Sequence, residues 1–396
     1  MNKQKPLRWG LICWLTYCTA YLCRVNFSAS LAPLSAALSV DYSVLGAAGA
    51  AFFAVYAVGQ LLNGFIGDHM HPVRFILTAL IGTTVCNIGV AFAGRIELIF
   101  LLWAANGYFQ SIFWSTIIRL LAVVTDKEHR GAASAGISCA SSFGYLISWC
   151  ILTPCFANQS VRLFFLTPAI AAVFMMAAWA MRMRVMQSVS VEPLSTQSLR
   201  QGVSRAMAVV LRERLPIVLV ACVFHGLIKE GIGFWIPTII RGMVSHPLYL
   251  AAALSLLPAA NFAGTLLAKR LLKRWNDAPY RVVIIGYVFM LPCCAVTLAL
   301  RGGWVLLPLS VITCLSASSN TVLLSFIPMR YQAEGVVASL VGMLDFCSYM
   351  GAAISTYVLG SMIGASGVHG ISVIWTFAAL VCIALLLLKR RRDGWA

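Results

Sequence analysis

Long apolar stretches, each about as long as a bilayer is thick, are the feature that most restricts how this chain can fold. A helix needs about 20 apolar residues to cross the hydrocarbon core, and twelve such stretches begin near residues 9, 43, 73, 97, 131, 160, 215, 247, 281, 303, 335 and 368. Hydrocarbon offers backbone groups no hydrogen-bond partner, so each stretch must satisfy its own by forming a helix. The sequence therefore predicts an all-α polytopic membrane protein with twelve transmembrane helices.

Composition excludes several other classes of protein. Of the 396 residues, 61% are hydrophobic and 10% are charged, which is too apolar for a soluble chain of this length. An outer-membrane barrel would show shorter segments of alternating hydrophobicity. The 13 cysteines are odd in number and contain no CxxC pair, so we interpret them as small packing residues and expect no metal site.

The distribution of basic residues predicts the orientation in the membrane. Of the 29 Lys and Arg, 23 fall at the two ends and in alternate loops, four fall in the other loops, and two lie within spans. This arrangement argues against a nucleic-acid partner for a chain of formal net charge +17. By the positive-inside rule it predicts a multi-pass protein of the cytoplasmic membrane, plasma or bacterial inner, with both termini cytoplasmic. The first stretch lacks a cleavage site and should remain as the first span.

A polar segment rich in serine interrupts the apolar pattern in the middle of the chain. It predicts a cytoplasmic linker over residues 185–212, between one six-helix half at 1–184 and another at 213–396. The halves show a weak internal correspondence, since Arg24 and Lys229 lie 205 positions apart. Many transporters are built from such repeats, with the substrate held at mid-membrane between them.

Arg24 and Lys229 each lie about 15 residues into an apolar span, which is roughly 22 Å at 1.5 Å per residue. A charge at that depth costs at least about 2.5 to 3.5 kcal/mol and normally faces a cavity or a partner. Two cations at matched depth in corresponding helices therefore predict an anion between them. The alternative is that Arg24 is structural and is satisfied by helix carbonyls or by Asn26.

Further candidates lie near the two cations. Helical spacing places Tyr17, Tyr21 and Ser28 on the face of Arg24, and His225 precedes the lysine by one turn.

Two acids within the spans are candidates for coupling. Glu230 follows Lys229 directly, and neighbouring residues on a helix do not face each other. Glu230 should therefore turn toward another helix or neutralise a basic residue in the empty site. Asp345, in the eleventh span, either carries a proton or pairs with one of the two cations.

A third group lies at the predicted cytoplasmic ends of the helices. The segment GFIGDHMHPVR places Asp68 at a helix end beside basic residues. An acid there can dock on an opposing helix N-terminus or pair with a basic loop, and can be released when the halves move. We assign Asp68, together with Arg119 and Arg130, to a gate.

Several short segments carry a resemblance to a known family: AYLCRVNF, GFIGD with HPVRF, GYFQSIFW leading to Arg119, KEHRG at 127–131, and GIGFWIPT. With these the chain resembles the major facilitator superfamily, and within it the organophosphate:phosphate antiporters, which include the glycerol-3-phosphate and hexose-phosphate transporters. The likeness covers most of residues 8–145 and a short part of the seventh span. It implies two pseudo-symmetric six-helix halves, a monomer, a small anionic substrate, and inorganic phosphate or protons as the coupling ion.

The resemblance also implies roles for individual residues. The family's two phosphate-gripping arginines fall on Arg24 and Lys229, and its tyrosines before the first arginine match Tyr17 and Tyr21.

The chain departs from the family at three positions. Where the glycerol-3-phosphate branch has a lysine on the second span this chain has Gln60, and where that branch has a histidine on the fifth it has Ser141. Lys229 also lacks the bidentate fork with which an arginine binds phosphate. Phosphorylated and carboxylated metabolites both remain open as substrates.

Together these features predict a secondary transporter of a small organic anion that works by alternating access, either as a phosphate exchanger or as a proton-coupled carrier. One alternative is a ligand-binding membrane sensor related to the same family. Another is a proton-coupled exporter of drugs or cations that would bind them at Glu230 and Asp345, although Arg24 and Lys229 would repel such substrates. The sequence contains no HExxH, GxSxG or P-loop motif, so we expect neither an enzyme nor a cofactor.

Overall fold

The computed structural model describes residues 4–124, 130–186, 196–242, 246–275, 278–300, 302–334 and 336–392, and within these ranges every regular element is a helix. The first half contains α1 (Gln4–Ala29), α2 (Leu31–Leu38), α3 (Tyr42–His69), α4 (Pro72–Phe92), α5 (Ile96–Gln110), α6 (Ile112–Val124), α7 (Arg130–Asn158) and α8 (Val161–Met186). After α9 (Thr196–Arg212) come α10 (Pro216–Arg241), α11 (Pro247–Arg274), α12 (Pro279–Ala299), η1 (Gly302–Val305), α13 (Leu306–Asn320), η2 (Thr321–Phe326), α14 (Ile327–Met329), η3 (Gln332–Glu334) and α15 (Val337–Arg392).

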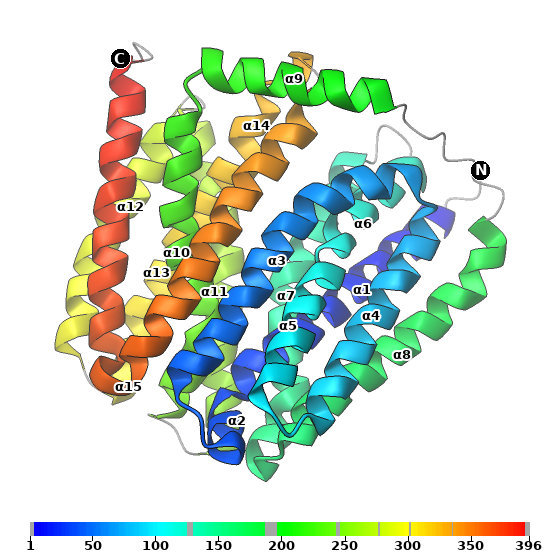
Figure 1. Ribbon diagram of the computed structural model, residues 1–396. Helices are drawn as coiled ribbons and strands as arrows, with labels where there is room; N and C mark the ends of the chain where they lie inside the picture. Colours follow the sequence, from blue (N-terminus) through cyan, green and yellow to red (C-terminus); the bar gives the residue numbers. More distant parts are fainter. Residues whose placement is uncertain are drawn as a thin grey trace.

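The twelve predicted spans are confirmed as a fold of twelve membrane-crossing helices. Two of the crossings are interrupted: α5 and α6 together form the fourth, and α13, the π-helix η2 and α14 form the tenth. The long element α15 turns back on itself and supplies the last two, seen as the orange and red limbs in Figure 1. By length and composition alone, ten stretches of the described chain qualify as spans. Neither α1, which carries Arg24, nor the first limb of α15, which carries Asp345, is among them.

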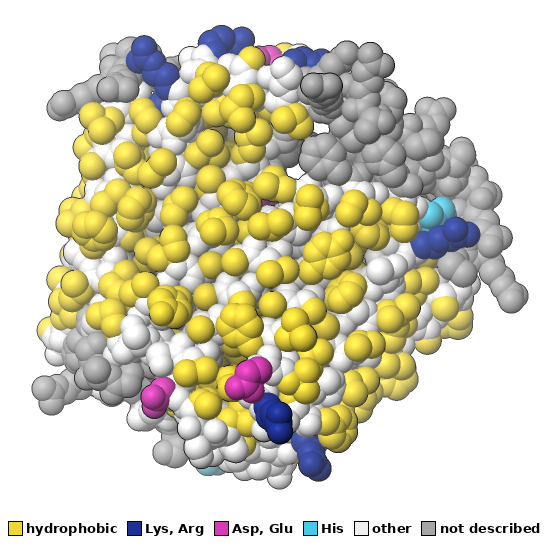
Figure 2. All heavy atoms as spheres, viewed as in Figure 1, with side chains coloured by type: hydrophobic (Ala, Val, Ile, Leu, Met, Phe, Trp, Pro, Cys, Tyr) yellow, Lys and Arg dark blue, Asp and Glu magenta, His cyan; other side chains and the backbone are white. Residues whose placement is uncertain are grey.

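The helices gather into two bundles with α9 lying across one end (Figure 1). The first turn of α1 and the last turn of α15 lie toward that end, which we call the terminal face. Where the bundles meet, α3 packs along α15 and α7 along α11, while α1 contacts α10. A band of hydrophobic side chains covers the flank of the molecule, and charged side chains stand mainly at its two edges (Figure 2). This surface is suited to lipid contact, because a bilayer solvates apolar side chains and penalises charges.

Glycines bring the two bundles together at the end opposite the terminal face. A Cβ on Gly46 of α3 would lie 2.8 Å from the carbonyl oxygen of Thr356 on α15, and one on Gly49 would lie 2.4 Å from the ring of Phe234 on α10. Small residues allow helix backbones to approach this closely. At this end the halves are in direct contact.

Glycine also sets the distance between α10 and α15, the two helices that position the second half's polar groups. A Cβ on Gly226 would lie 1.8 Å from the carbonyl oxygen of Ser348, and one on Gly351 would lie 1.9 Å from that of Val223. We expect Gly226→Ala to lower the melting temperature in detergent, because overpacking a tight contact costs about 1–3 kcal/mol. Gly10→Ala in α1 is the matched control, since nothing lies within 4 Å of that position. Equal melting temperatures for the two variants would contradict this account of the crossing.

The helix α9 is amphipathic and is fixed to the second half. Ala206, Val209 and Val210 are buried against the core. At its end Arg212 donates from Nη2 to both carboxylate oxygens of Glu334, at 2.8 and 2.9 Å, and from Nε to Glu213 at 2.9 Å. The hydrogen bonds that Arg212 donates to these two glutamates raise its pKa above the ordinary value, so the guanidinium keeps its charge throughout the usable pH range.

We expect Arg212→Gln to speed amide hydrogen exchange in α9 while changing the melting temperature little, because exposed ion pairs contribute little to stability. Arg214→Gln, two residues further along, is the matched loss of charge. Unchanged exchange in α9 of the Arg212 variant would show that apolar burial alone holds this helix.

Candidate functional site

Aromatic rings surround Arg24 in the middle of α1. The carbon of its guanidinium lies 5.0 to 5.8 Å from the centroids of five rings, which we call the aromatic cage: Tyr21, Phe52, Phe53, Tyr56 and Tyr349. Only 9% of the arginine side chain is exposed. A cation held over ring faces away from water is attracted by their quadrupoles, which offsets part of its desolvation cost.

The cage is assembled from both halves of the protein. Phe52, Phe53 and Tyr56 lie on neighbouring turns of α3, and Tyr21 lies one turn before the arginine on α1. The fifth ring, Tyr349, belongs to α15, and its centroid lies 4.5 Å from that of Tyr56. The surroundings of the arginine are therefore complete only when the halves are together.

Glu230 joins the two predicted cations. Its Oε2 lies 3.4 Å from Nη2 of Arg24, and its Oε1 lies 2.6 Å from Nζ of Lys229. The carboxylate is buried, with 7% of its side chain exposed. Glu230 turns toward another helix, as expected, and it also contacts Lys229, the residue directly before it. The second contact was not predicted. It is possible because the long flexible side chain of a lysine can bend along the helix.

The alternative reading of Arg24, in which Asn26 satisfies it, does not match the structure. The Nδ2 of Asn26 donates to Oδ1 of Asn87 at 2.7 Å and to the carbonyl of Phe164 at 3.1 Å, within the first half. Arg24 instead reaches across to Glu230.

Other predicted ligands form a second layer around the cage. The ring of Tyr17 lies 5.2 Å from that of Tyr21, and Gln60 donates from Nε2 to the hydroxyl of Tyr56 at 3.0 Å. Ser141 is half-buried on α7, one turn before Tyr145. The ring of Tyr145 packs on that of Tyr21, with their centroids 5.0 Å apart.

Asp345 and His225 occupy different places relative to this site. Asp345 lies one turn before Tyr349 on α15 and interacts electrostatically with Lys229 and Glu230. His225 is fully buried, with Nδ1 2.7 Å from the hydroxyl of Tyr287 and Nε2 3.2 Å from Oδ1 of Asn320. Its ring faces α12 and α13, away from the arginine. A direct role for His225 at the anion site thus has no support from its position.

The gate residues are only partly described. Arg119 on α6 donates from Nη1 to the carbonyl of Met70, between α3 and α4, at 3.5 Å. The side chains of Asp68 and Arg130 lie outside the described residues, so their gating role stays a prediction.

Beside Arg24 and Glu230 there is a small cavity of about 20 Å³. This is close to the minimum that holds one water molecule. Its lining comes from α1, α3, α5, α7 and α10: Arg24, Val25, Ser28, Phe52, Phe53, Trp103, Tyr145, Glu230, Gly233 and Phe234. In this conformation the protein's own side chains nearly fill the space beside Arg24 and Glu230.

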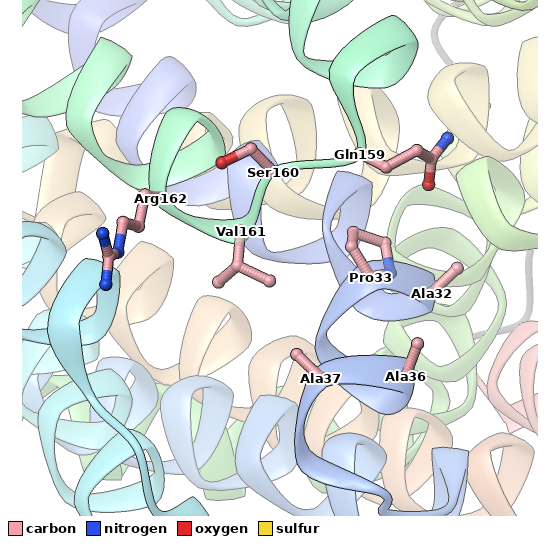
Figure 3. A pocket seen from close by; sticks show the side chains of 8 residues that line it. All are labelled: Ala32, Pro33, Ala36, Ala37, Gln159, Ser160, Val161 and Arg162. Atoms are coloured by element: carbon pink, nitrogen blue, oxygen red, sulfur yellow. The ribbon is translucent and has the colours of Figure 1, made fainter.

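A wider groove of about 690 Å³ opens at the end opposite the terminal face, between α2 and the turn from α7 to α8 (Figure 3). Arg162 is its one charged lining residue within the described chain, and the rest of the lining is mainly small and apolar. Next to it, Arg241 at the end of α10 donates a hydrogen bond to Gln159 of the first half. The groove lacks the converging charges found around Glu230.

Sequence reasoning missed most of the aromatic residues at this site. Phe52, Phe53 and Tyr56 follow one another in AAFFAVYAV, and Tyr349 lies four residues after Asp345. A ring four residues from an intramembrane charge is a usable signal, since both then lie on one helix face. Trp103 has no charged residue at that spacing, so the sequence did not point to it.

The sequence profile described as Major Facilitator Superfamily matches residues 13–356. This chain belongs to the Major Facilitator Superfamily. Membership of this superfamily of transporters supports the prediction that the chain is not an enzyme.

Solved structures agree with this fold. The crystal structure of the nucleoside transporter NupG superposes with a TM-score of 0.77 at 15% identity, with 100% of both chains covered. A D-xylose-proton symporter gives 0.74 at 13% identity, with 96% of each chain covered. At these identities the likeness concerns the fold alone.

Curated relatives confirm the resemblance to organophosphate:phosphate antiporters. The chain is 31% identical over 118 residues to the "Probable hexose phosphate transport protein" of Chlamydia trachomatis, covering 30% of this chain and 26% of that protein. It is 30% identical over 118 residues to the "Membrane sensor protein UhpC" of Salmonella typhimurium (30% and 27%). To the "Hexose-6-phosphate:phosphate antiporter" of Escherichia coli K12 it is 26% identical over 126 residues (31% and 27%). The matched segments thus span about a quarter of each relative's length.

Proposed function

We propose that this protein is a secondary transporter of a small organic anion, and that it works by alternating access of its two halves, residues 1–184 and 213–396. The anion binds between Arg24 of α1 and Lys229 of α10. We place the protein in the cytoplasmic membrane as a monomer with both termini cytoplasmic, an orientation that rests on the asymmetry of its basic residues.

The observation that carries this proposal is the position of the Glu230 carboxylate. One of its oxygens lies 2.6 Å from the lysine of the second half, and the other lies 3.4 Å from the arginine of the first. Two oxygens of a phosphate or a carboxylate can occupy the same positions. We therefore interpret Glu230 as an internal anion that fills the binding site while the site is empty.

A substrate anion would take the place of Glu230 between the cations. It would gain its second cationic contact only when the halves approach, so its binding would favour closure. A ligand shifts a conformational equilibrium only through such a difference in its contacts with the two states. In the empty carrier Glu230 makes the same bridge, so the protein can return without leaving two buried cations unpaired.

Glu230 and Asp345 also bear on coupling. A carboxylate displaced by the substrate is free to accept a proton, which would make the carrier a proton symporter. If neither acid takes up a proton and the return step is faster with a second anion in the site than with Glu230 in the bridge, the carrier works mainly as an exchanger. The phosphate-linked names of the curated relatives favour exchange against phosphate as the first arrangement to test.

Reconstitution into proteoliposomes tests the proposal. We expect vesicles loaded with phosphate to accumulate labelled phosphate or an organic phosphate, and an imposed pH gradient to drive uptake only in the proton-coupled case. Binding without any flux would favour the sensor alternative, for which one relative, the membrane sensor UhpC, provides a precedent. Export of an organic cation with no anion binding would instead support the exporter alternative.

A further inference from the structure

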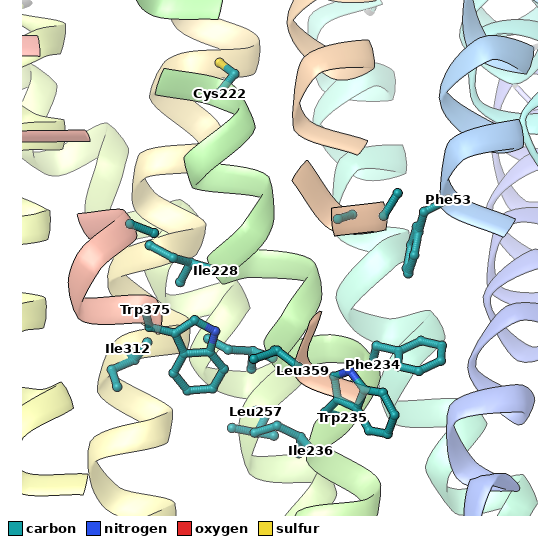
Figure 4. Close-up of a cluster of buried hydrophobic side chains, with 14 of the residues drawn as sticks. Phe53, Cys222, Ile228, Phe234, Trp235, Ile236, Leu257, Ile312, Leu359 and Trp375 are labelled. Atoms are coloured by element: carbon teal, nitrogen blue, oxygen red, sulfur yellow. The ribbon is translucent and has the colours of Figure 1, made fainter. Parts of the chain in front are cut away.

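The walls of the cavity beside Arg24 are aromatic and come from four different helices. Phe52 and Phe53 belong to α3, Trp103 to α5, Tyr145 to α7 and Phe234 to α10. The rings contact one another: Phe52 stacks on Trp103 at 5.3 Å, and Phe53 meets Phe234 of the other half edge-on at 6.1 Å. Figure 4 shows Phe53 and Phe234 facing each other from α3 and α10.

Polar groups are scarce on these walls. Apart from Arg24 and Glu230, the side chains of the described lining offer three polar groups: the hydroxyls of Ser28 and Tyr145 and the indole N–H of Trp103. Ser28 already donates its proton to the carbonyl of Val25 at 2.8 Å. A sugar bound here would bury several hydroxyls against walls on which the three phenylalanine rings offer no hydrogen bond and Trp103 and Tyr145 offer one polar group each; a buried polar group without a partner is strongly disfavoured.

The same rings fill the site when it is empty. The cavity of about 20 Å³ is far smaller than a benzene ring, so the site must open for any organic anion to enter. In the empty site Glu230 lies where the charged group of the substrate would bind, and the rings of Phe53 and Phe234 lie where the rest of the substrate would bind. The group that best replaces these rings is another flat apolar ring, since aromatic pairs attract in stacked and edge-on geometries.

Building on the proposed function, we propose that the substrate is an aromatic organic anion. Its phosphate or carboxylate group lies between Arg24 and Lys229, and its ring lies among Phe53, Trp103 and Phe234. This distinguishes the chain from carriers of polyol phosphates, whose substrates need hydrogen-bonding walls.

Thermal-shift titration of the purified full-length protein tests this with four probes: phenyl phosphate, glucose 6-phosphate, inorganic phosphate and phenylacetate. A ligand that binds the folded state raises the melting temperature, and the stabilisation grows with the logarithm of the ligand concentration divided by its dissociation constant, so each titration yields an affinity. We expect phenyl phosphate or phenylacetate to bind at least about tenfold more tightly than glucose 6-phosphate or inorganic phosphate, because only the aromatic probes gain ring contacts. Whichever aromatic probe is tighter identifies the head group.

Two variants separate the ring contacts from the charge contacts. Phe53→Leu removes one ring of the cage around Arg24 as well as a ring of the cavity wall, so the readout is a ratio: the affinity for the aromatic probe relative to that for inorganic phosphate should fall about fivefold or more. Phe174→Leu is the matched control, because that ring is 72% exposed on the flank of the molecule. Glucose 6-phosphate binding as tightly as phenyl phosphate would overturn the aromatic assignment and leave the anion site standing. Failure of all four probes to bind would overturn both.

Discussion

Arg24→Gln is expected to abolish anion uptake into proteoliposomes and to weaken anion binding on the order of tenfold to a hundredfold. The loss follows from removing one of two charge-assisted contacts, each worth roughly 1.5 to 3 kcal/mol. Lys229→Gln removes the other contact and should have a similar effect. Arg24→Lys keeps the charge but loses the planar group that lies among five rings, so it should bind weakly.

The Arg24→Gln variant should still fold, which makes the result interpretable. In the parent, Glu230 has Lys229 at 2.6 Å, so the carboxylate keeps one cation when the arginine is gone. Arg162→Gln provides the matched control, since that arginine lines the groove at the far end and stacks on Phe92 at 5.6 Å. If both Gln variants at the site bound and carried the anion like the parent, Arg24 would be a structural residue.

Much of the fold could be predicted from hydropathy, because spanning a bilayer imposes a length and a composition on each helix. The predicted starts near residues 43, 73, 97 and 131 fall next to the first residues of α3, α4, α5 and α7. Hydropathy could not show where spans are interrupted. The break between α5 and α6 and the π-helical turn η2 leave composition unchanged and depend on local backbone hydrogen bonding.

The sequence predicted the charged residues of the candidate site but not the aromatic residues that surround them. A buried charge is rare enough in a span to stand out, so Arg24, Lys229 and Glu230 were visible from the sequence alone. Aromatic residues are common in spans, and the sequence does not show which of them face the interface. The convergence of Phe53 with Phe234 depends on how α3 crosses α10, which is set by tertiary packing at Gly49.

Glu230→Gln tests the other half of the proposal, and here the expected changes in binding and in transport have opposite signs. In the parent, an anion must first displace the carboxylate from Arg24 and Lys229. Without that internal competitor, anion affinity should rise about tenfold or more. The reason is that the apparent affinity equals the intrinsic affinity multiplied by the fraction of molecules whose site is open to the anion, and Glu230 reduces that fraction in the parent. The unliganded variant should be less stable than the parent, because two cations lose their buried counter-ion. Added anion should therefore raise its melting temperature further than it does for the parent.

Glu230→Gln should affect net uptake and anion exchange differently. Net uptake requires the empty carrier to return, and in the variant this step leaves Arg24 and Lys229 without the bridge that Glu230 provides. Net uptake should therefore fall sharply, while exchange of bound anion for bound anion, which never empties the site, should continue. Asp345→Asn is the matched control: it removes a neighbouring acid that does not form the bridge, and should change affinity much less. Weaker binding in Glu230→Gln, with net uptake and exchange lost together, would mean that Glu230 helps to hold the substrate and does not stand in for it.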